Sequence, residues 1–197
     1  PVWGVSAPSA NKFGRVSPTT AAHVATEFGD ELLVLDGGAC EVGIESTIVD
    51  CTRGVPVLLR PGAITRDHIE RACGQRPLSK EELLAHTPRA SGTLLAHYAP
   101  NAKVRLMEAK QLQSALELLG TDGQNIAVYH RSALHNPSKG VHLRAMPQQA
   151  LATARELFGT LRDFDALGAK LIWIETPPDS ADWEGVRDRL QRAAAAG

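Results

Sequence analysis

The sequence predicts an α/β fold, because short apolar runs with the composition of strands alternate with stretches that have helical spacing. The alternation is clearest after Pro100, where the expected strands are "KVRLM", "NIAVYH", "GVHLRAM" and "AKLIWIE". Apolar side chains recur at helical spacing in three further segments, through Leu112, Leu116 and Leu119, through Leu151, Ala154, Phe158 and Leu161, and in "GVRDRLQRAAAA". Residues 101–197 are therefore expected to form a small open α/β layer.

Residues 1–75 carry a second set of strand and helix signals. Ser17, followed by Pro, predicts a helix start with Ser17 as its N-cap, and Gly29 predicts the end of that helix. Strands are expected in "ELLVLDGG", "ESTIVDCT" and "VPVLLRPG", the last two joined as a tight hairpin. "TRDHIERACG" predicts a short helix between Thr65 as cap and Gly74 as stop.

Residues 76–100 mix Pro, Ser, Gly and charged residues without a sustained strand or helix period. This stretch predicts a linker with at most a short helical turn. The expected organisation is therefore one α/β segment over residues 1–75, a linker over 76–100 and a second α/β segment over 101–197.

Charge and cysteine content narrow the class of protein. Lys and Arg number 21 against 22 Asp and Glu, which argues against extensive nucleic-acid coating and leaves room for a weak or local RNA contact. No apolar run approaches the roughly 18 residues that span a bilayer. Three cysteines without C-x-x-C spacing suit a reducing compartment and are expected to be buried. We expect a cytoplasmic protein without a membrane span.

The stretch "SANKFGRVSPTT" places hydroxyls, an amide and a glycine directly before a predicted helix. A helix N-terminus offers free N–H groups and the positive end of a dipole, so this loop is a candidate phosphate or carboxylate site. Ser9 and Asn11 have side chains that donate hydrogen bonds, and Gly14 permits close approach of a ligand. The alternative is that Ser17 only caps its helix while Ser9 and Asn11 make an ordinary turn.

Two later positions are also candidates for a binding site. Ser46 and Thr47 start a predicted strand, so their hydroxyls face opposite sides, and we favour Ser46 for the site. Arg60 ends an apolar strand before a Pro-Gly turn, at the kind of strand end where open α/β layers bind ligands. Its guanidinium suits bidentate binding of phosphate or carboxylate, although a structural ion pair would use the same residue. There is no H-E-x-x-H motif or Cys/His cluster, so no protein-bound metal site is expected.

Taken in order, "APSANKFGRVSPT", "LDGGACEVGIESTIVD", "LLRPGAIT" and "GTLLAHYAP" closely resemble motifs of the threonylcarbamoyl-AMP synthases, a YrdC-type family, in its two-domain form. The resemblance implies the carboxy-terminal part of a YrdC-like twisted-sheet α/β domain, an extended linker over the active site, and a small Rossmann-like α/β domain. It implies a nucleotidyltransferase that converts L-threonine, bicarbonate and ATP into threonylcarbamoyl-AMP and pyrophosphate, with Mg²⁺ on the ATP phosphates. The product would pass to a complex that transfers the threonylcarbamoyl group to tRNA adenosine.

The resemblance also implies roles for particular residues. Ala7 and Ser46 would bind threonine. The nucleotide would be bound by Ser9, Asn11, Ser17 and Arg60. His97 and Tyr98, in the "HYAP" stretch, would form a lid over the cleft, the alternative for Tyr98 being an anchor for the linker.

One family motif is not found in this sequence. The family's basic Lys/Arg motif lies upstream of the "SAN" motif, so we expect an amino-terminal portion of the catalytic domain before residue 1 and an inactive fragment without it. A rival reading is a non-catalytic YrdC-like RNA-binding module, for which clustered Lys and Arg would be expected. A second rival is the carbamoyl-adenylate-forming domain of a hydrogenase-maturation enzyme, which the "HYAP" linker and trailing α/β segment disfavour.

Overall fold

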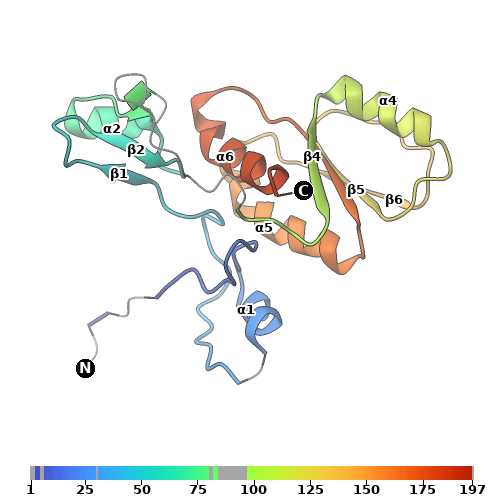
Figure 1. Ribbon diagram of the computed structural model, residues 1–197, viewed down its shortest axis with the longest axis horizontal. Helices are drawn as coiled ribbons and strands as arrows, with labels where there is room; N and C mark the ends of the chain where they lie inside the picture. The colour runs from blue at the N-terminus through green and yellow to red at the C-terminus, as the bar shows by residue number, and fades with distance from the viewer. Residues whose placement is uncertain (1–2, 5–6, 30, 80–81, 84–96, 197) are drawn as a thin grey trace.

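A computed structural model describes residues 3–4, 7–29, 31–79, 82–83 and 97–196 of the chain. Two sheets organise these residues, one of three strands in the order β1-β2-β3 and one of four strands in the order β4-β7-β5-β6. Figure 1 shows the small sheet at the left and the larger one at the right, with the first helix at the bottom. The predicted α/β class is confirmed.

The small sheet is built on the expected hairpin, but its connection, residues 51–56, is longer than the tight turn that was predicted. Strands β1 (Ile48–Asp50) and β2 (Val57–Arg60) pair antiparallel, and the Asp50 carboxylate accepts the N–H of Thr52 at 2.9 Å, which fixes the turn. Helix α2 (Arg66–Cys73) is capped by Thr65 and ends at Gly74, as predicted. A further strand, β3 (Leu78–Ser79), pairs parallel with β2 inside the segment expected to be a linker. Residues 84–96, most of that expected linker, lie outside the described residues.

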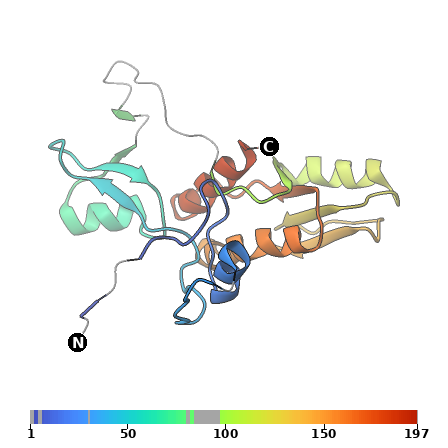
Figure 2. The ribbon, with the colours of Figure 1, turned by 60° about the horizontal axis from the view of Figure 1, so that its bottom comes forward.

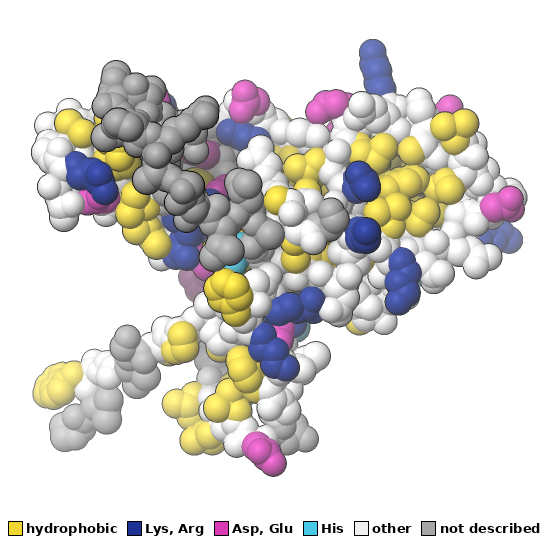
Figure 3. All heavy atoms as spheres, viewed as in Figure 1, with side chains coloured by type: hydrophobic (Ala, Val, Ile, Leu, Met, Phe, Trp, Pro, Cys, Tyr) yellow, Lys and Arg dark blue, Asp and Glu magenta, His cyan; other side chains and the backbone are white. Residues whose placement is uncertain are grey.

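The prediction of a strand in residues 31–38 is wrong. Helix α1 (Ala21–Phe28) ends at Gly29 as predicted, but the described residues after it form turn and irregular backbone. Leu33 and Leu35 are 85% and 83% exposed. An apolar run becomes a strand only when a neighbouring strand accepts its hydrogen bonds, and no described strand lies beside this run. Figure 3 shows exposed hydrophobic side chains around this part of the molecule.

The larger sheet is fully parallel and matches the expected order of elements. Its strands and helices are β4 (Lys103–Met107), α4 (Ala109–Leu119), β5 (Ile126–His130), β6 (Val141–Ala145), α5 (Ala150–Ala166), β7 (Leu171–Glu175) and α6 (Glu184–Ala194), the last preceded by a short 3₁₀ turn, Ala181–Trp183. Figure 2 shows α4 on one face of this sheet and α5 on the other. The larger sheet and its helices therefore form three layers, with helices on both faces of the sheet.

Each face of the larger sheet has its own core. Leu112 and Leu116 of α4 pack with Val128 and Trp173 on one face. On the other face, α5 and α6 pack in a larger cluster that includes Phe158. Residue 151, expected in the buried stripe of α5, is 63% exposed, because Ala150, Ala154 and Leu157 occupy the buried positions.

The two parts of the chain share one core. Val16, Ile44 and Tyr98 belong to the same buried cluster as α5 and α6. At Gly43, whose φ is +81°, an added Cβ would lie 2.4 Å from the carbonyl oxygen of Ala154. The backbone around Gly43 therefore packs directly on α5, an approach that only glycine permits.

The three cysteines, Cys40, Cys51 and Cys73, are free and exposed. The expectation that they are buried is wrong, because two of them lie in loops and Cys73 lies at the exposed end of α2.

Candidate functional site

The loop of residues 9–15 is shaped by its own polar side chains. The Ser9 hydroxyl donates to Oδ1 of Asn11 at 2.5 Å, and Nδ2 of Asn11 donates to the carbonyl oxygens of Lys12 (3.0 Å) and Arg15 (3.2 Å). Ala10 between them has a left-handed φ of 54°. The structure thus brings Ser9 and Asn11 together, and Asn11 closes the loop. Ala7, just before the loop, is exposed.

Ser17 does not cap a helix, so that part of the prediction is wrong. Helix α1 begins three residues later than predicted, and its N-cap is Thr20, whose hydroxyl accepts the N–H of His23 at 3.3 Å. The Ser17 residue is buried, and its hydroxyl donates to Oε1 of Glu45. This bond connects Ser17, two residues after the loop of residues 9–15, to the segment that carries Ser46.

Ser46 and Arg60 lie in direct contact at one end of the small sheet. Nε of Arg60 donates to the Ser46 carbonyl oxygen at 2.9 Å, and Nη2 approaches the Ser46 hydroxyl at 3.2 Å. The Thr47 hydroxyl instead donates to the carbonyl oxygen of Ile64 at 2.8 Å. Ser46 is exposed, so its hydroxyl and the guanidinium form one polar surface that can hold an anionic or zwitterionic ligand.

The described end of the expected linker lies between the two parts of the chain. Tyr98 is 6% exposed and stacks on Phe158 of α5, with ring centroids 5.6 Å apart. The His97 ring meets Phe13 edge-on at 5.8 Å. Backbone bonds fix the same stretch, from the N–H of His97 to the Arg192 carbonyl oxygen (3.3 Å) and from the N–H of Ala99 to the Gly14 carbonyl oxygen (3.0 Å). This packing anchors Tyr98 in the core, while the lid role stays a prediction.

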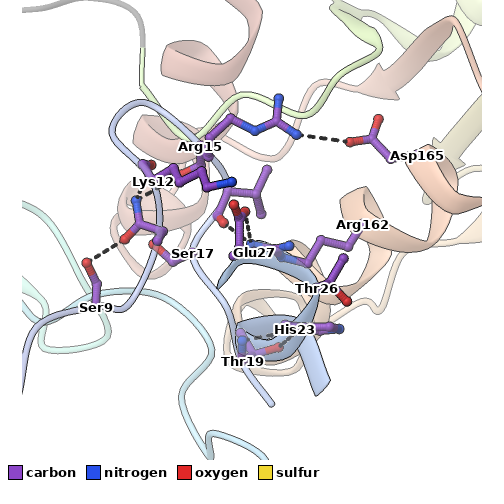
Figure 4. A network of polar contacts seen from close by, with 12 residues as sticks. Ser9, Lys12, Arg15, Ser17, Thr19, His23, Thr26, Glu27, Arg162 and Asp165 are labelled. Carbon is purple, nitrogen blue, oxygen red and sulfur yellow. Dashed lines mark hydrogen bonds and ion pairs between the residues drawn. The ribbon is translucent and has the colours of Figure 1, made fainter. Parts of the chain in front are cut away.

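Helix α5 contributes an arginine to the back of the loop. Nη2 of Arg162 donates to the Val16 carbonyl oxygen and to Oε1 of Glu27, the latter at 2.8 Å. Figure 4 shows Arg15 reaching toward Asp165, at 3.9 Å. The carboxylate of Asp165 also accepts the backbone N–H groups of residues 101 and 102, at 2.7 Å and 3.0 Å. These contacts hold the end of the loop and helix α1 against α5.

His23 lies close to Arg162, which pairs with Glu27. Its Nδ1 is 3.2 Å from the backbone nitrogen of Thr19. Burial lowers the pKa of His23 below its usual value, and the Arg162 guanidinium lowers it further, while the carboxylate of Asp163 opposes them. The neutral imidazole is therefore the form that accepts the Thr19 N–H.

Sequence reasoning missed two residues that join the motifs. Glu45 accepts from Ser17, and its Oε2 also accepts from Nε of Arg189 on α6 at 2.7 Å. The signal for Arg189 was present, because a charged residue stands in the apolar stripe formed by Val186, Leu190 and Ala193. Nothing in the local sequence identifies its partner, which lies 144 residues earlier in the chain.

Within the described residues, no group of three or more His, Cys, Asp or Glu side chains could hold a metal ion. None of the described helices is long and apolar enough to cross a membrane.

Comparison with known proteins gives two family matches that divide the chain. The family model described as "Threonylcarbamoyl-AMP synthase, C-terminal domain" matches residues 64–195, and the model described as "Telomere recombination" matches residues 3–62. The threonylcarbamoyl-AMP synthases of Bacillus subtilis (strain 168) and Pyrococcus abyssi (strain GE5 / Orsay) are each 31% identical to the chain. Each alignment covers 96% of this chain and 57% of the relative, so the chain spans a little over half the length of these relatives.

Solved structures give the same match. The crystal structure of P. abyssi Sua5 complexed with L-threonine superposes with a TM-score of 0.76 at 28% identity, covering 96% of this chain and 57% of that one. A P. abyssi Sua5 variant with adjacent His and Tyr residues changed to Ala superposes with a TM-score of 0.78 at 28% identity, covering 96% and 56%.

Proposed function

Because the chain belongs to the threonylcarbamoyl-AMP synthase family, we propose that it carries part of the site of an L-threonylcarbamoyladenylate synthase, a nucleotidyltransferase. The substrates are L-threonine, bicarbonate and ATP, and the products are threonylcarbamoyl-AMP and pyrophosphate. The observation that carries this proposal is the contact of Arg60 with Ser46, which joins a phosphate-binding cation to a hydroxyl on one exposed surface. The L-threonine complex of the P. abyssi relative supports threonine as the amino acid.

We assign the site residues to two ligands, threonine and the nucleotide. Ser46 and the backbone around Ala7 bind threonine, while Ser9, Asn11 and Arg60 bind the nucleotide. Ser17, which the resemblance also assigns to the nucleotide, is buried and its hydroxyl donates to Glu45, so we assign it instead to holding that carboxylate. We keep His97 and Tyr98 as the proposed lid residues, and they would cover the site as a fixed wall, because Tyr98 stacks on Phe158 in the core.

The reaction needs positioning and charge stabilisation more than acid–base chemistry. The threonine amine and bicarbonate form a carbamate with loss of water. A carbamate oxygen then attacks the α-phosphorus of ATP, the new O–P bond forms, and the bond to pyrophosphate breaks. Arg60 stabilises negative charge on the phosphates as this exchange occurs. Mg²⁺ enters with ATP as part of the substrate, on phosphate oxygens.

The product is a labile mixed anhydride, and we propose, as the family resemblance implies, that it passes to a threonylcarbamoyl transferase complex that acts on tRNA. Contact of this chain with tRNA itself is weak or indirect, in keeping with its net charge of −1. We propose a cytoplasmic location, which the three free, exposed thiols support, since such thiols persist in a reducing compartment.

The test is pyrophosphate release by the full-length product of the gene that encodes this chain. The protein is given ATP and Mg²⁺, with L-threonine and bicarbonate each omitted in turn. We expect release to need both, and labelled bicarbonate to appear in an adenylate. Release that ignores threonine, or none from a folded protein, contradicts the proposal. RNA binding without turnover would then favour a non-catalytic YrdC-like module.

A further inference from the structure

Arg189 is a charged side chain in the apolar face of α6. It is 1% exposed and shares the buried stripe of the helix with Val186, Leu190 and Ala193. A buried guanidinium is stable only where its N–H groups find acceptors, so its partners identify its role.

Three of the four acceptor atoms lie in the first part of the chain. Nε donates to Oε2 of Glu45 at 2.7 Å, and Nη2 donates to the Glu45 carbonyl oxygen at 3.1 Å. Nη1 donates to the Pro61 carbonyl oxygen at 2.8 Å and to Oδ2 of Asp188 at 2.8 Å. The guanidinium carbon also lies over the Tyr98 ring, 5.2 Å from its centroid. One side chain therefore contacts three separate segments outside its own helix.

Two of these three segments adjoin a proposed ligand contact. Glu45 precedes Ser46 and accepts from Ser17, and Pro61 directly follows Arg60. We infer that Arg189 is a positioning residue, which fixes the threonine- and nucleotide-binding segments relative to one another from the opposite side of the domain interface. This inference rests on the proposed function for the identity of the ligands, and on the contacts above for the positioning.

The backbone of α6 is close enough for these contacts because of a glycine one turn earlier. A Cβ added at Gly185 would lie 3.1 Å from the Gly62 carbonyl oxygen and 3.0 Å from Cδ1 of Ile44. Residues at i and i+4 share a helix face, so Gly185 gives the close approach and Arg189 makes the polar contacts. The backbone at Gly62 is also closely packed, since a Cβ added there would lie 2.6 Å from the backbone nitrogen of Thr47.

A purely structural role would predict a different outcome from a positioning role. A buried ion pair adds little net stability compared with apolar packing, but it fixes geometry when several acceptors share one planar fork. Arg189→Lys keeps the positive charge for Glu45, yet a single ammonium cannot match the directions of the three guanidinium nitrogens. This variant therefore separates charge compensation from positioning.

The experiment uses the full-length gene product and compares R189K with R144K. Arg144 is a matched control, because it pairs with Asp163 and, among the described residues, makes no hydrogen bond or ion pair to residues 44–48 or 60–64. We measure the dissociation constant for L-threonine, the KM values for threonine and ATP, and amide exchange in segments 44–48 and 60–64. For R189K we expect threonine affinity to fall about tenfold and exchange in both segments to quicken, with kcat less affected. R144K should behave as wild type.

A double-mutant cycle that combines R189K with Ser46→Ala measures the coupling between the two residues in threonine binding, and general destabilisation does not change this coupling. Arg189 and Ser46 interact through Glu45, so their effects on threonine binding should be less than additive. Strictly additive effects, or wild-type threonine affinity with wild-type exchange in R189K, overturn the inference. If R189K does not fold, E45Q, which keeps an acceptor for Ser17, should weaken threonine binding in the same way, and unchanged binding overturns the inference. A wild-type protein that binds no threonine refutes the proposed function, while exchange in the two segments still decides the role of Arg189.

Discussion

Nε of Arg60 donates to the carbonyl oxygen of Ser46 at 2.9 Å, and its Nη2 lies 3.2 Å from the hydroxyl of the same serine. The two residues stand 14 positions apart and meet because β1 and β2 pair antiparallel, with Ile48 opposite Arg60. Arg60 thus uses one edge of its guanidinium for the protein, and its Nη1 makes no hydrogen bond to the described residues, which leaves its N–H groups for a phosphate.

Arg60→Ala should abolish adenylate formation while the protein stays folded. Removing the guanidinium takes away charge stabilisation at the phosphates, a loss of about 10²-fold or more in rate. The measurement is pyrophosphate release by the full-length gene product, alongside its thermal unfolding. Arg53→Ala is the control, because Arg53 pairs with Asp50 in the hairpin turn. Turnover retained by Arg60→Ala would remove Arg60 from the site.

Ser46→Ala should raise the KM for threonine about tenfold and change the KM for ATP much less. The hydroxyl is exposed beside Arg60, and one lost hydrogen bond to a charged ligand accounts for a change of this size. Steady-state kinetics with each substrate varied in turn gives both values. Ser114→Ala, at an exposed position on α4, serves as the control. Equal effects on both KM values would contradict a threonine-specific contact.

Gly43→Ala should destabilise the junction of the two parts by about 2–3 kcal/mol, because the new methyl group would overlap the α5 backbone. Calorimetric unfolding should show a lower Tm. Gly159→Ala is the opposite control, since nothing lies within 4 Å of its added Cβ and it stands inside α5. There the loss of glycine should stabilise the protein by about 0.5–1 kcal/mol. A Gly43→Ala protein as stable as wild type would show that α5 does not pack on this residue.

Acid should loosen the contact between His23 and Thr19. The folded pKa of His23 lies below its unfolded value of 6.5, so the unfolded state binds more protons between the two values. The stability that the neutral ring contributes is present above pH 6.5 and is lost as pH falls through the folded pKa. Amide exchange at Thr19, corrected for its intrinsic pH dependence, should quicken over that window. His23→Gln should lack the step, and an identical step in that variant would assign it to another group.

The sequence predicted the elements whose signals are local. Helix α2, with its cap and stop residues, and the four parallel strands follow from patterns within a few residues. The strand expected in residues 31–38 failed because a strand also depends on a neighbour. Ser17 was misassigned because Thr20, with a side chain of the same kind, stands three residues closer to the helix. Glu45 and Arg189 were missed as partners because 144 residues separate them.

The segment from His97 to Ala102 is tied on every side, to Arg192, to Gly14 and to Asp165. A pivot needs backbone whose torsions are free to change, and here four N–H groups in six residues are already bonded to other parts of the fold. These residues are consequently a fixed connection between the two parts and not a hinge. Any opening motion that admits substrate has to bend elsewhere, and a spacer inserted within this stretch would remove one connection between the two parts while their shared core remains.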